Sequence, residues 1–428
     1  MNRRFPILYD RTFYLFGMKG VGKRAWLDHE LPGAVYVDLN DERLLAKLQR
    51  NPQLLKQQLQ TVSPGQWVVI CELQRLPSLI DEVYPLVANQ GLRFALLSSN
   101  IHQLKTEYNQ KLASGQIPIK RIYPLTPIEL GETFDVDEVL RYGTIPSVWN
   151  SPDRVSILNH LHSSLQIDLR DTVRSKVSLK QLTGFIKFIP IAVSLHGQSL
   201  DVQSVAKQCD IDIEYVYLYM DVLQDIMLAT LLPAYRMKYR RDGRLKKPSK
   251  RLSSARGYNR ETTDKTTKHT GKSSKRQLKL PKLPKSSRLQ PKLYWNDCGL
   301  LRAFGNNLGP PSEDERASLI EGWILGQLTA YNEQMSIFDQ ITHWKSARTN
   351  STVTFLLTRD DQRIAIDIKN TADYTKDTLK GLNSVASLAG LTRRILVYTG
   401  TKDKSENDID ILTVSSFQEA AKNNSLWI

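Results

Sequence analysis

The sequence predicts an α/β protein made of more than one domain. Its 428 residues suffice for two to three domains, each with its own hydrophobic core. Three apolar, strand-like runs within the first hundred residues are separated by helix-compatible segments, and residues 291–428 again alternate helices and strands. This alternation is typical of α/β domains.

The first strand-like run, residues 12–16, leads into a glycine-rich loop. Gly17, Gly22 and Lys23 have the spacing of a phosphate-binding Walker A loop, whose backbone amides face phosphate oxygens. In such a loop a Ser or Thr after the lysine holds Mg²⁺, but here the residue is Arg24, whose guanidinium offers only donors. We therefore expect a loop that binds phosphates well and the metal poorly. Its predicted nucleotide-binding residues are Gly17, Gly20, Gly22, Lys23 and Arg24.

The next two strand-like runs carry the candidate catalytic residues. Residues 68–71 end in Cys71 and Glu72, where a Walker B strand carries an Asp oriented on Mg²⁺ and a Glu that polarises water. Cys71 thus removes a second metal ligand, while Glu72 remains. Residues 94–97 lead to Ser99, the candidate sensor of the γ-phosphate. No metal-binding residues are predicted, and we expect ATP binding to depend little on Mg²⁺.

Residues 178–235 read as helices followed by a short hairpin. Asp201 and Asp212 begin two successive helices, and residues 227–232 resemble a β-wing, which is the outline of a winged-helix domain. Between Asp201 and Asp225 there are six acidic residues and one lysine. Such a surface repels phosphate, so an interdomain contact or a protein partner is favoured here over DNA.

The positive charge of the chain is concentrated in one segment, which we call the basic insert. Residues 236–292 hold 21 of the 59 Lys and Arg and three of the 44 Asp and Glu, so the insert carries +18 and the remainder −3. It is rich in Ser, Thr, Pro and Gly and lacks apolar periodicity, which predicts disorder. One interpretation is a solvated tether; the other is a polycation that binds DNA or RNA phosphates without reading sequence.

Cysteine usage and hydropathy predict a cytoplasmic protein with no membrane partner. Cys71, Cys209 and Cys298 lie far apart in the sequence and form neither a disulfide framework nor a metal cluster. The longest apolar stretches, such as residues 188–195, are far shorter than a bilayer span, and the N-terminus is a poor signal peptide.

Several blocks together resemble a group of prokaryotic AAA-type ATPases. These blocks are FGMKGVGKRAWL, YVDLNDERLL, WVVICELQRLP, LLSSN, PKLYWNDCGLLRA, LIEGWILGQL and IAIDIKN. The group combines an N-terminal P-loop domain with a C-terminal domain of unknown function that resembles restriction endonucleases. The resemblance covers the chain except about residues 240–288 and implies that ATP is bound. Lys23, Glu72, Gln74 and Ser99 match the group's pattern, whereas Arg24, Cys71 and Gln116 make this chain a divergent member.

The same resemblance gives the C-terminal domain a candidate nuclease-like site. Glu321 lies on a predicted helix, and Asp367 and Lys369 end a predicted strand in the D-x-K order of restriction-type nucleases, whose carboxylates hold Mg²⁺. The position of the central metal ligand is Thr354, which brings no charge. We expect a nuclease-like remnant of Glu321, Asp367 and Lys369 that does not cleave nucleic acid.

The predicted domains are a P-loop AAA-like domain (1–128), a helical linker with a winged-helix domain (129–235), the basic insert (236–292) and a restriction-endonuclease-like α/β domain (293–428). The predicted function is an ATP-binding switch with weak or absent hydrolysis that acts on or near nucleic acid. Two alternatives stay open: an active ATPase with an unusual metal shell, and a non-catalytic interaction scaffold.

Overall fold

The computed structural model describes residues 11–101, 104, 117–174, 178–236, 290–346 and 350–427. Gln116 and nearly all of the basic insert lie outside these residues, so the predictions made for them are not tested. Within the described part of the chain, no helix combines the length and the apolar character that crossing a bilayer requires.

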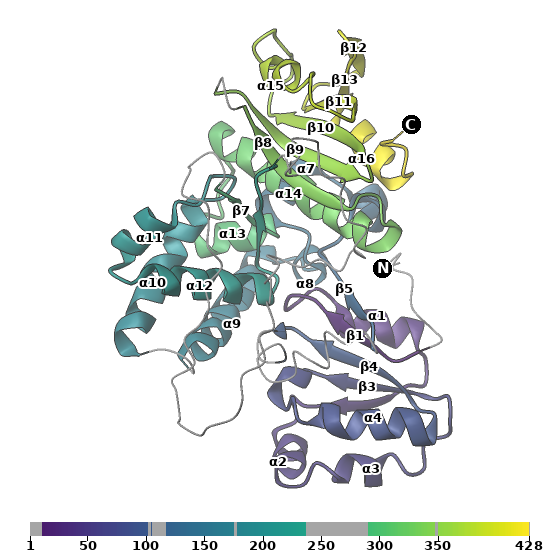
Figure 1. Cartoon of the computed structure of the whole chain (residues 1–428). Coiled ribbons are helices and arrows are strands. Elements are labelled where there is room, and N and C mark those ends of the chain that lie inside the picture. The colour runs from purple at the N-terminus through teal and green to yellow at the C-terminus, as the bar shows by residue number, and fades with distance from the viewer. Residues whose placement is uncertain are drawn as a thin grey trace, which may run out of the picture.

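A parallel five-stranded sheet in the order β2-β3-β4-β1-β5 forms the N-terminal part, in the lower half of Figure 1. Its strands are β1 (Phe13–Phe16), β2 (Val35–Asp38), β3 (Trp67–Cys71), β4 (Arg93–Ser98) and β5 (Ile119–Arg121). The side chains of β1 are all buried, as expected of a strand covered on both faces. The helices are α1 (Lys23–Glu30), α2 (Glu42–Arg50), α3 (Leu54–Gln58) and α4 (Leu79–Gln90), with a 3₁₀ turn η1 (Leu73–Arg75).

Helices dominate the middle of the chain. They are α6 (Pro127–Leu130), η2 (Gly131–Thr133), α7 (Val136–Tyr142), α8 (Pro146–Trp149), α9 (Arg154–Arg174), α10 (Leu179–Ser194), α11 (Val202–Cys209) and α12 (Ile213–Asp225). Asp201 and Asp212 stand at the N-caps of α11 and α12, as predicted. The Asp201 carboxylate accepts hydrogen bonds from two amides of α11, which satisfies donors that the helix itself leaves free.

The short hairpin predicted after the two helices is wrong: the described residues there hold one strand, which pairs with a strand on the far side of the basic insert. β6 (Ala229–Leu232) and β7 (Lys292–Trp295) are antiparallel, so the predicted boundary at 292/293 falls inside β7. Both ends of the insert contact His343: its backbone bonds Pro233 and Tyr235, and its ring nitrogen Nε2 lies 2.9 Å from the Gln290 carbonyl. Described residues just before the insert and near its end therefore contact the same residue, His343.

The C-terminal part is a six-stranded mixed sheet in the order β12-β13-β11-β10-β9-β8, at the top of Figure 1. Its strands are β8 (Gln340–Lys345), β9 (Thr352–Arg359), β10 (Gln362–Lys369), β11 (Leu391–Tyr398), β12 (Lys404–Glu406) and β13 (Ile409–Thr413). Its helices are α13 (Cys298–Phe304), α14 (Glu313–Met335), α15 (Lys380–Ser384) and α16 (Val414–Lys422). β9 and β10 form an antiparallel hairpin, and the helix predicted to carry Glu321 is α14.

Candidate nucleotide site and nuclease-like remnant

A cavity of about 260 Å³ lies where the parallel strands of the N-terminal sheet end. Because parallel strands present their carboxyl ends at one edge, the loops that follow them meet there, which is where open α/β sheets bind ligands. The cavity is lined by Gly20, Gly22, Lys23, Arg24, Ala25, Asp38, Asn40, Cys71, Glu72 and Leu97. It thus brings together most of the residues predicted from the Walker-like segments. Asp38 and Asn40 were not among the predicted site residues.

The glycines of the loop are required by its backbone and by its neighbours. Gly20 and Gly22 have φ angles of 82° and 83°, in the left-handed region that glycine adopts without strain. A Cβ on Gly17 would lie 2.5 Å from the Ile122 side chain and 2.8 Å from its carbonyl oxygen. The loop can therefore take this shape only with glycine, or with a residue that tolerates strain, at these positions.

Lys23 begins α1 and is folded back under the loop. Its Nζ donates hydrogen bonds to the carbonyls of Gly17 at 2.7 Å and Met18 at 3.2 Å. Burial lowers the pKa of the amine, and the nearby Glu72 acts in the opposite direction. A buried ammonium is costly unless it is paired, so an anion in the cavity would stabilise Lys23 further.

Arg24 is paired with an acidic residue of the neighbouring strand. Its Nη1 lies 2.6 Å from Asp38 Oδ2, and its Cζ lies 5.0 Å from the centre of the Tyr36 ring. Asp38 ends β2 and stands directly opposite Cys71 of β3 in the register of the two parallel strands. The guanidinium and the carboxylate therefore lie next to the position where the sequence has lost the Walker B aspartate.

Cys71 is a poor replacement for that aspartate. Burial, and after it the negative charge of the nearby Asp38, raise the pKa of its thiol to about 12 although Arg24 acts in the opposite direction, so the side chain is neutral at pH 7. Metal ligands from cysteine are thiolates. Among the described residues, no three His, Cys, Asp or Glu side chains are grouped so that they could hold a metal ion.

The two candidate catalytic residues belong to one hydrogen-bonded group. Glu72 Oε2 accepts from Ser99 Oγ at 2.6 Å and from Gln74 Nε2 at 2.5 Å. Ser98, which is fully buried, donates to the Gln74 amide oxygen at 2.7 Å. Glu72 is held at the cavity wall with a left-handed backbone (φ 57°), and Ser99 is directed at Glu72.

The nuclease-like residues form ion pairs within the protein. Asp367 is buried; its Oδ1 accepts from Thr354 Oγ1 at 2.8 Å, and its Oδ2 lies 3.0 Å from Lys369 Nζ. Thr354, which replaces the expected central ligand, thus stabilises the carboxylate as a neutral donor. The predicted residues Asp367 and Lys369 are in contact, but they neutralise each other.

Glu321 is engaged by two residues that the sequence analysis missed. Its Oε2 accepts a hydrogen bond of 2.7 Å from the Tyr294 hydroxyl and lies 3.7 Å from Lys292 Nζ. The pKa of Tyr294 is raised far above its usual value by burial and then by the negative charges of Glu321 and Asp367. The charges of Glu321 and Asp367 are therefore both close enough to the Tyr294 hydroxyl to keep it protonated. No signal in the sequence marked Lys292 and Tyr294 on β7, because the strand that pairs with β7 is remote in sequence.

The N-terminal part of the chain matches a known domain family. Residues 9–131 match the model of an AAA domain, and residues 316–417 match that of a domain of unknown function, DUF4143. The chain thus carries an AAA-type domain with a parallel P-loop-type sheet, which implies nucleotide binding, followed by a second domain whose function the match leaves open. No curated protein matches the chain.

Three solved structures are distantly similar to the chain. A variant of RuvB from Thermotoga maritima is 12% identical over 51% of this chain and 81% of its own, with a TM-score of 0.24. The ORC1 protein of Aeropyrum pernix, in complex with DNA, is 13% identical over 55% and 82%, with a TM-score of 0.25. Protein VC1899 from Vibrio cholerae is 12% identical over 97% and 96%, with a TM-score of 0.20. Likenesses at such scores carry no argument about this chain.

Proposed function

We propose that this chain binds ATP at the edge of its N-terminal sheet and hydrolyses it weakly or not at all, so that the nucleotide acts as a switch. The observation that supports this most directly is the pair formed by Arg24 and Asp38 beside the neutral thiol of Cys71. Two positions that hold Mg²⁺ in a working site are replaced here. Arg24 stands at one of these positions, and its guanidinium is paired with Asp38, which lies opposite the other, Cys71.

The guanidinium supplies charge that the metal supplies elsewhere. Arginine can bind phosphate oxygens bidentately and stays protonated at all relevant pH values. In this proposal Lys23 leaves the carbonyls of Gly17 and Met18 for the phosphates, and Arg24 contributes a second cation without any divalent ion. Glu72 remains at the cavity, but water activation without a metal to align the phosphates gives slow turnover.

Binding through the loop is tested with Lys23→Ala and a matched control, Lys47→Ala, which removes an exposed lysine of α2 in the same domain. Lys23→Ala should weaken ATP binding by about 1.5–3 kcal/mol, the worth of a hydrogen bond to a charged group. Lys47→Ala should leave it unchanged in calorimetric titration. Equal affinity of wild type and Lys23→Ala would eliminate the site, and lack of any nucleotide binding would favour the interaction scaffold.

For the C-terminal domain we propose a restriction-endonuclease-like fold without nuclease activity. Asp367 and Glu321 are both engaged by lysines of this chain, and Thr354 brings no charge to a metal. Incubation of plasmid DNA or RNA with Mg²⁺ or Mn²⁺ should therefore give no cleavage. Cleavage that is present in wild type and lost in Lys369→Ala would overturn the proposal.

We further propose that the basic insert binds nucleic acid without sequence preference. Its charge of +18 against −3 for the rest of the chain supports this. With about six phosphate contacts on duplex DNA, log K should fall with log salt at a slope of about −5. Deletion of residues 240–288 should leave the fold intact, because both ends of the insert contact His343. If the deleted protein binds DNA as tightly and with the same slope, the insert is a spacer.

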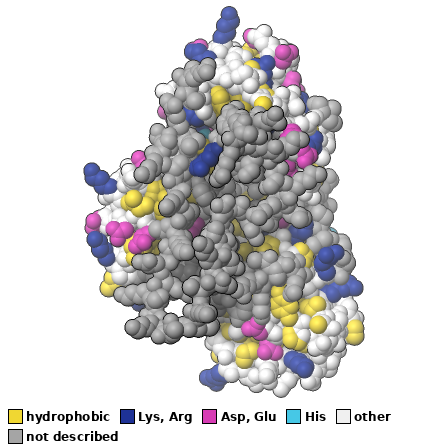
Figure 2. All heavy atoms as spheres, in the orientation of Figure 1, with side chains coloured by type: hydrophobic (Ala, Val, Ile, Leu, Met, Phe, Trp, Pro, Cys, Tyr) yellow, Lys and Arg dark blue, Asp and Glu magenta, His cyan; other side chains and the backbone are white. Residues whose placement is uncertain are grey.

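The surface of α11 and α12 supports a protein partner for the predicted winged-helix domain. Asp201, Asp210, Asp212, Glu214 and Asp221 are exposed there. Figure 2 shows acidic side chains beside hydrophobic ones on the left of the molecule, over the region where Figure 1 places α11. Reversal of two of these charges, Asp212→Lys and Glu214→Lys, should weaken the binding of a basic protein partner. The affinity for DNA should not fall. Reduced DNA binding would contradict this assignment.

A further inference from the structure

Helix α9, which lies outside the N-terminal sheet, contacts the phosphate-binding loop through a charged side chain. Lys19 Nζ lies 3.1 Å from Asp168 Oδ2 and donates a hydrogen bond of 2.5 Å to Ser164 Oγ. The two charged side chains are each a little under half exposed, so the pair is accessible to solvent and to a ligand. Lys19 is the third residue of the loop, four positions before Lys23.

The same helix contacts the site at two further points. A Cβ on Gly20 would meet Leu161 Cδ2 at 3.3 Å, so the loop packs closely against α9. Asn100 Nδ2, at the end of the segment that carries Ser99, lies 3.1 Å from Thr172 Oγ1 of α9. Contacts from Leu161 to Thr172 therefore extend along α9 and reach two of the loops that surround the cavity.

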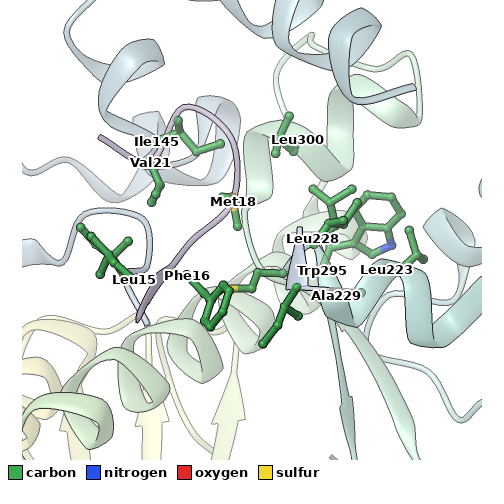
Figure 3. Close-up of a cluster of buried hydrophobic side chains, with 14 of the residues drawn as sticks. Leu15, Phe16, Met18, Val21, Ile145, Leu223, Leu228, Ala229, Trp295 and Leu300 are labelled. Carbon is green, nitrogen blue, oxygen red and sulfur yellow. The ribbon is translucent and has the colours of Figure 1, made fainter. Parts of the chain in front are cut away.

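The loop is also anchored to the residues just before α9. A Cβ on Gly20 would lie 2.9 Å from Ser147 Oγ and 3.1 Å from Ile145 Cγ2. Figure 3 draws Met18, Val21 and Ile145 within one buried cluster, and all three are almost completely inaccessible. With the apolar side of the loop fixed in this way, Lys19, like Lys23, is a polar side chain of the loop that can exchange partners.

Asp168 and a bound phosphate would use the same cation. The Lys19 ammonium is close enough to Lys23 for its charge to lower the pKa of that amine, so it contributes to the positive field of the cavity. An ammonium on a flexible four-carbon stem can turn from one anion to another without backbone movement. Without nucleotide, Asp168 neutralises Lys19; with nucleotide, the phosphates become its competitor.

We infer that Asp168, with Ser164, is a positioning residue through which α9 senses nucleotide: phosphates in the cavity draw Lys19 away from Asp168, and the hold of the loop on α9 is released. This inference rests on the proposed nucleotide binding and adds its regulation. It follows from linkage that a change which removes the Asp168 carboxylate but keeps the Lys19 ammonium tightens nucleotide binding, and that nucleotide loosens α9.

The test compares Asp168→Asn with Asp171→Asn, which removes an exposed carboxylate from the same helix. Asp168→Asn should tighten ATP binding by about two- to fivefold at low salt, the range of a partly exposed ion pair. Asp171→Asn should leave affinity unchanged. In a Lys19→Met background Asp168→Asn should no longer change affinity. If Asp168→Asn leaves affinity unchanged, or acts equally with and without Lys19, the inference is wrong.

Hydrogen exchange supplies a readout that a merely structural role would not move in the same way. ATP should speed amide exchange in residues 158–172 of wild type, and the same segment of Asp168→Asn should exchange faster already without nucleotide. If wild type binds ATP through Lys23 but α9 exchange does not respond, sensing fails and the proposed binding stands. If wild type binds no nucleotide and Lys23→Ala is indistinguishable from it, both fail together.

Discussion

Acidification should weaken the hydrogen bonds by which His196 connects the middle and C-terminal parts of the chain. Its Nδ1 accepts a hydrogen bond from the Trp295 amide at 3.0 Å, and its Nε2 lies 2.9 Å from the Ser318 carbonyl. A neutral imidazole has one donor and one acceptor nitrogen, so these partners require the proton on Nε2. Protonation would place a second hydrogen on Nδ1, facing the Trp295 N–H.

The size of the effect follows from the pKa of His196. Burial lowers it from 6.5 to about 4, whereas the unfolded chain titrates near its ordinary value. A base with a lowered folded pKa contributes stability above pH 6.5 and loses it as the pH falls from 6.5 towards 4. At about 1.4 kcal/mol per pKa unit the full loss is about 3 kcal/mol, of which about 2 kcal/mol is lost between pH 7 and pH 5.

Among the residues that the structure describes, two other buried groups titrate in this range, so the variant must be compared with wild type. Burial lowers the pKa of His343 to about 4, which acts in the same direction as His196. Burial raises the pKa of Asp297 to about 6. Protonation of this carboxyl therefore stabilises the folded protein as the pH falls from 6 towards 4, which partly offsets the destabilisation caused by the two histidines. The difference between two proteins that share both groups isolates His196.

Urea unfolding of wild type, His196→Gln and the control His160→Gln should be measured at pH 7 and pH 5. His160 is an exposed histidine of α9. Between the two pH values wild type and His160→Gln should lose about 2 kcal/mol more unfolding free energy than His196→Gln. If His196→Gln loses as much as wild type, the ring is not the titrating group.

Three further predictions address packing and the two altered sites. Gly322→Ala should lower the unfolding free energy by about 1–3 kcal/mol, because the new Cβ would lie 2.4 Å from His196 Cε1. The control Gly326→Ala, on the same helix, should not lower it, because the nearest neighbour of that Cβ would lie at 3.8 Å. Equal denaturant midpoints of the two variants would refute this prediction. Thr354→Asp should place a carboxylate beside Asp367 and lower the Tm, and Mn²⁺ should restore it in the variant alone; a Tm that does not respond to Mn²⁺ would mean that the fold offers no metal site. The double change Arg24→Thr with Cys71→Asp should raise phosphate release above wild type, whose turnover should stay well below about 1 s⁻¹; wild-type turnover at or above that rate would favour the active ATPase.

Local patterns predicted the parts of the fold that depend on local chemistry. The apolar runs that became β1, β3 and β4 are readable because strands buried on both faces are continuous hydrophobic segments. The loop from Gly17 to Lys23 was readable because its glycines are needed for the backbone angles that the structure shows. The helix start at Asp201 followed from the hydrogen-bonding capacity of a short carboxylate, whereas Asp212 stands at the N-cap of α12 without a side-chain hydrogen bond.

The contacts that decide the chemistry join segments remote in sequence. Asp38 reaches Arg24 because β2 pairs with β3 in a register that sets Asp38 opposite Cys71; the one available signal was that residues 35–38 also end in an acid at the same sheet edge. Lys19 and Asp168 are 149 positions apart, and β6 and β7 are separated by the whole insert. No periodicity marks such pairs, since they depend on how the domains pack together.

The central claim is that Arg24 and Lys23 bind nucleotide phosphates without the metal. A calorimetric titration of ATP into the wild-type chain, once with Mg²⁺ and once with EDTA, tests it most directly. Dissociation constants that agree within about threefold, which is less than 1 kcal/mol, are the predicted result. Binding that is tight with Mg²⁺ and lost with EDTA would contradict the account, because the metal would then supply what the guanidinium is proposed to supply.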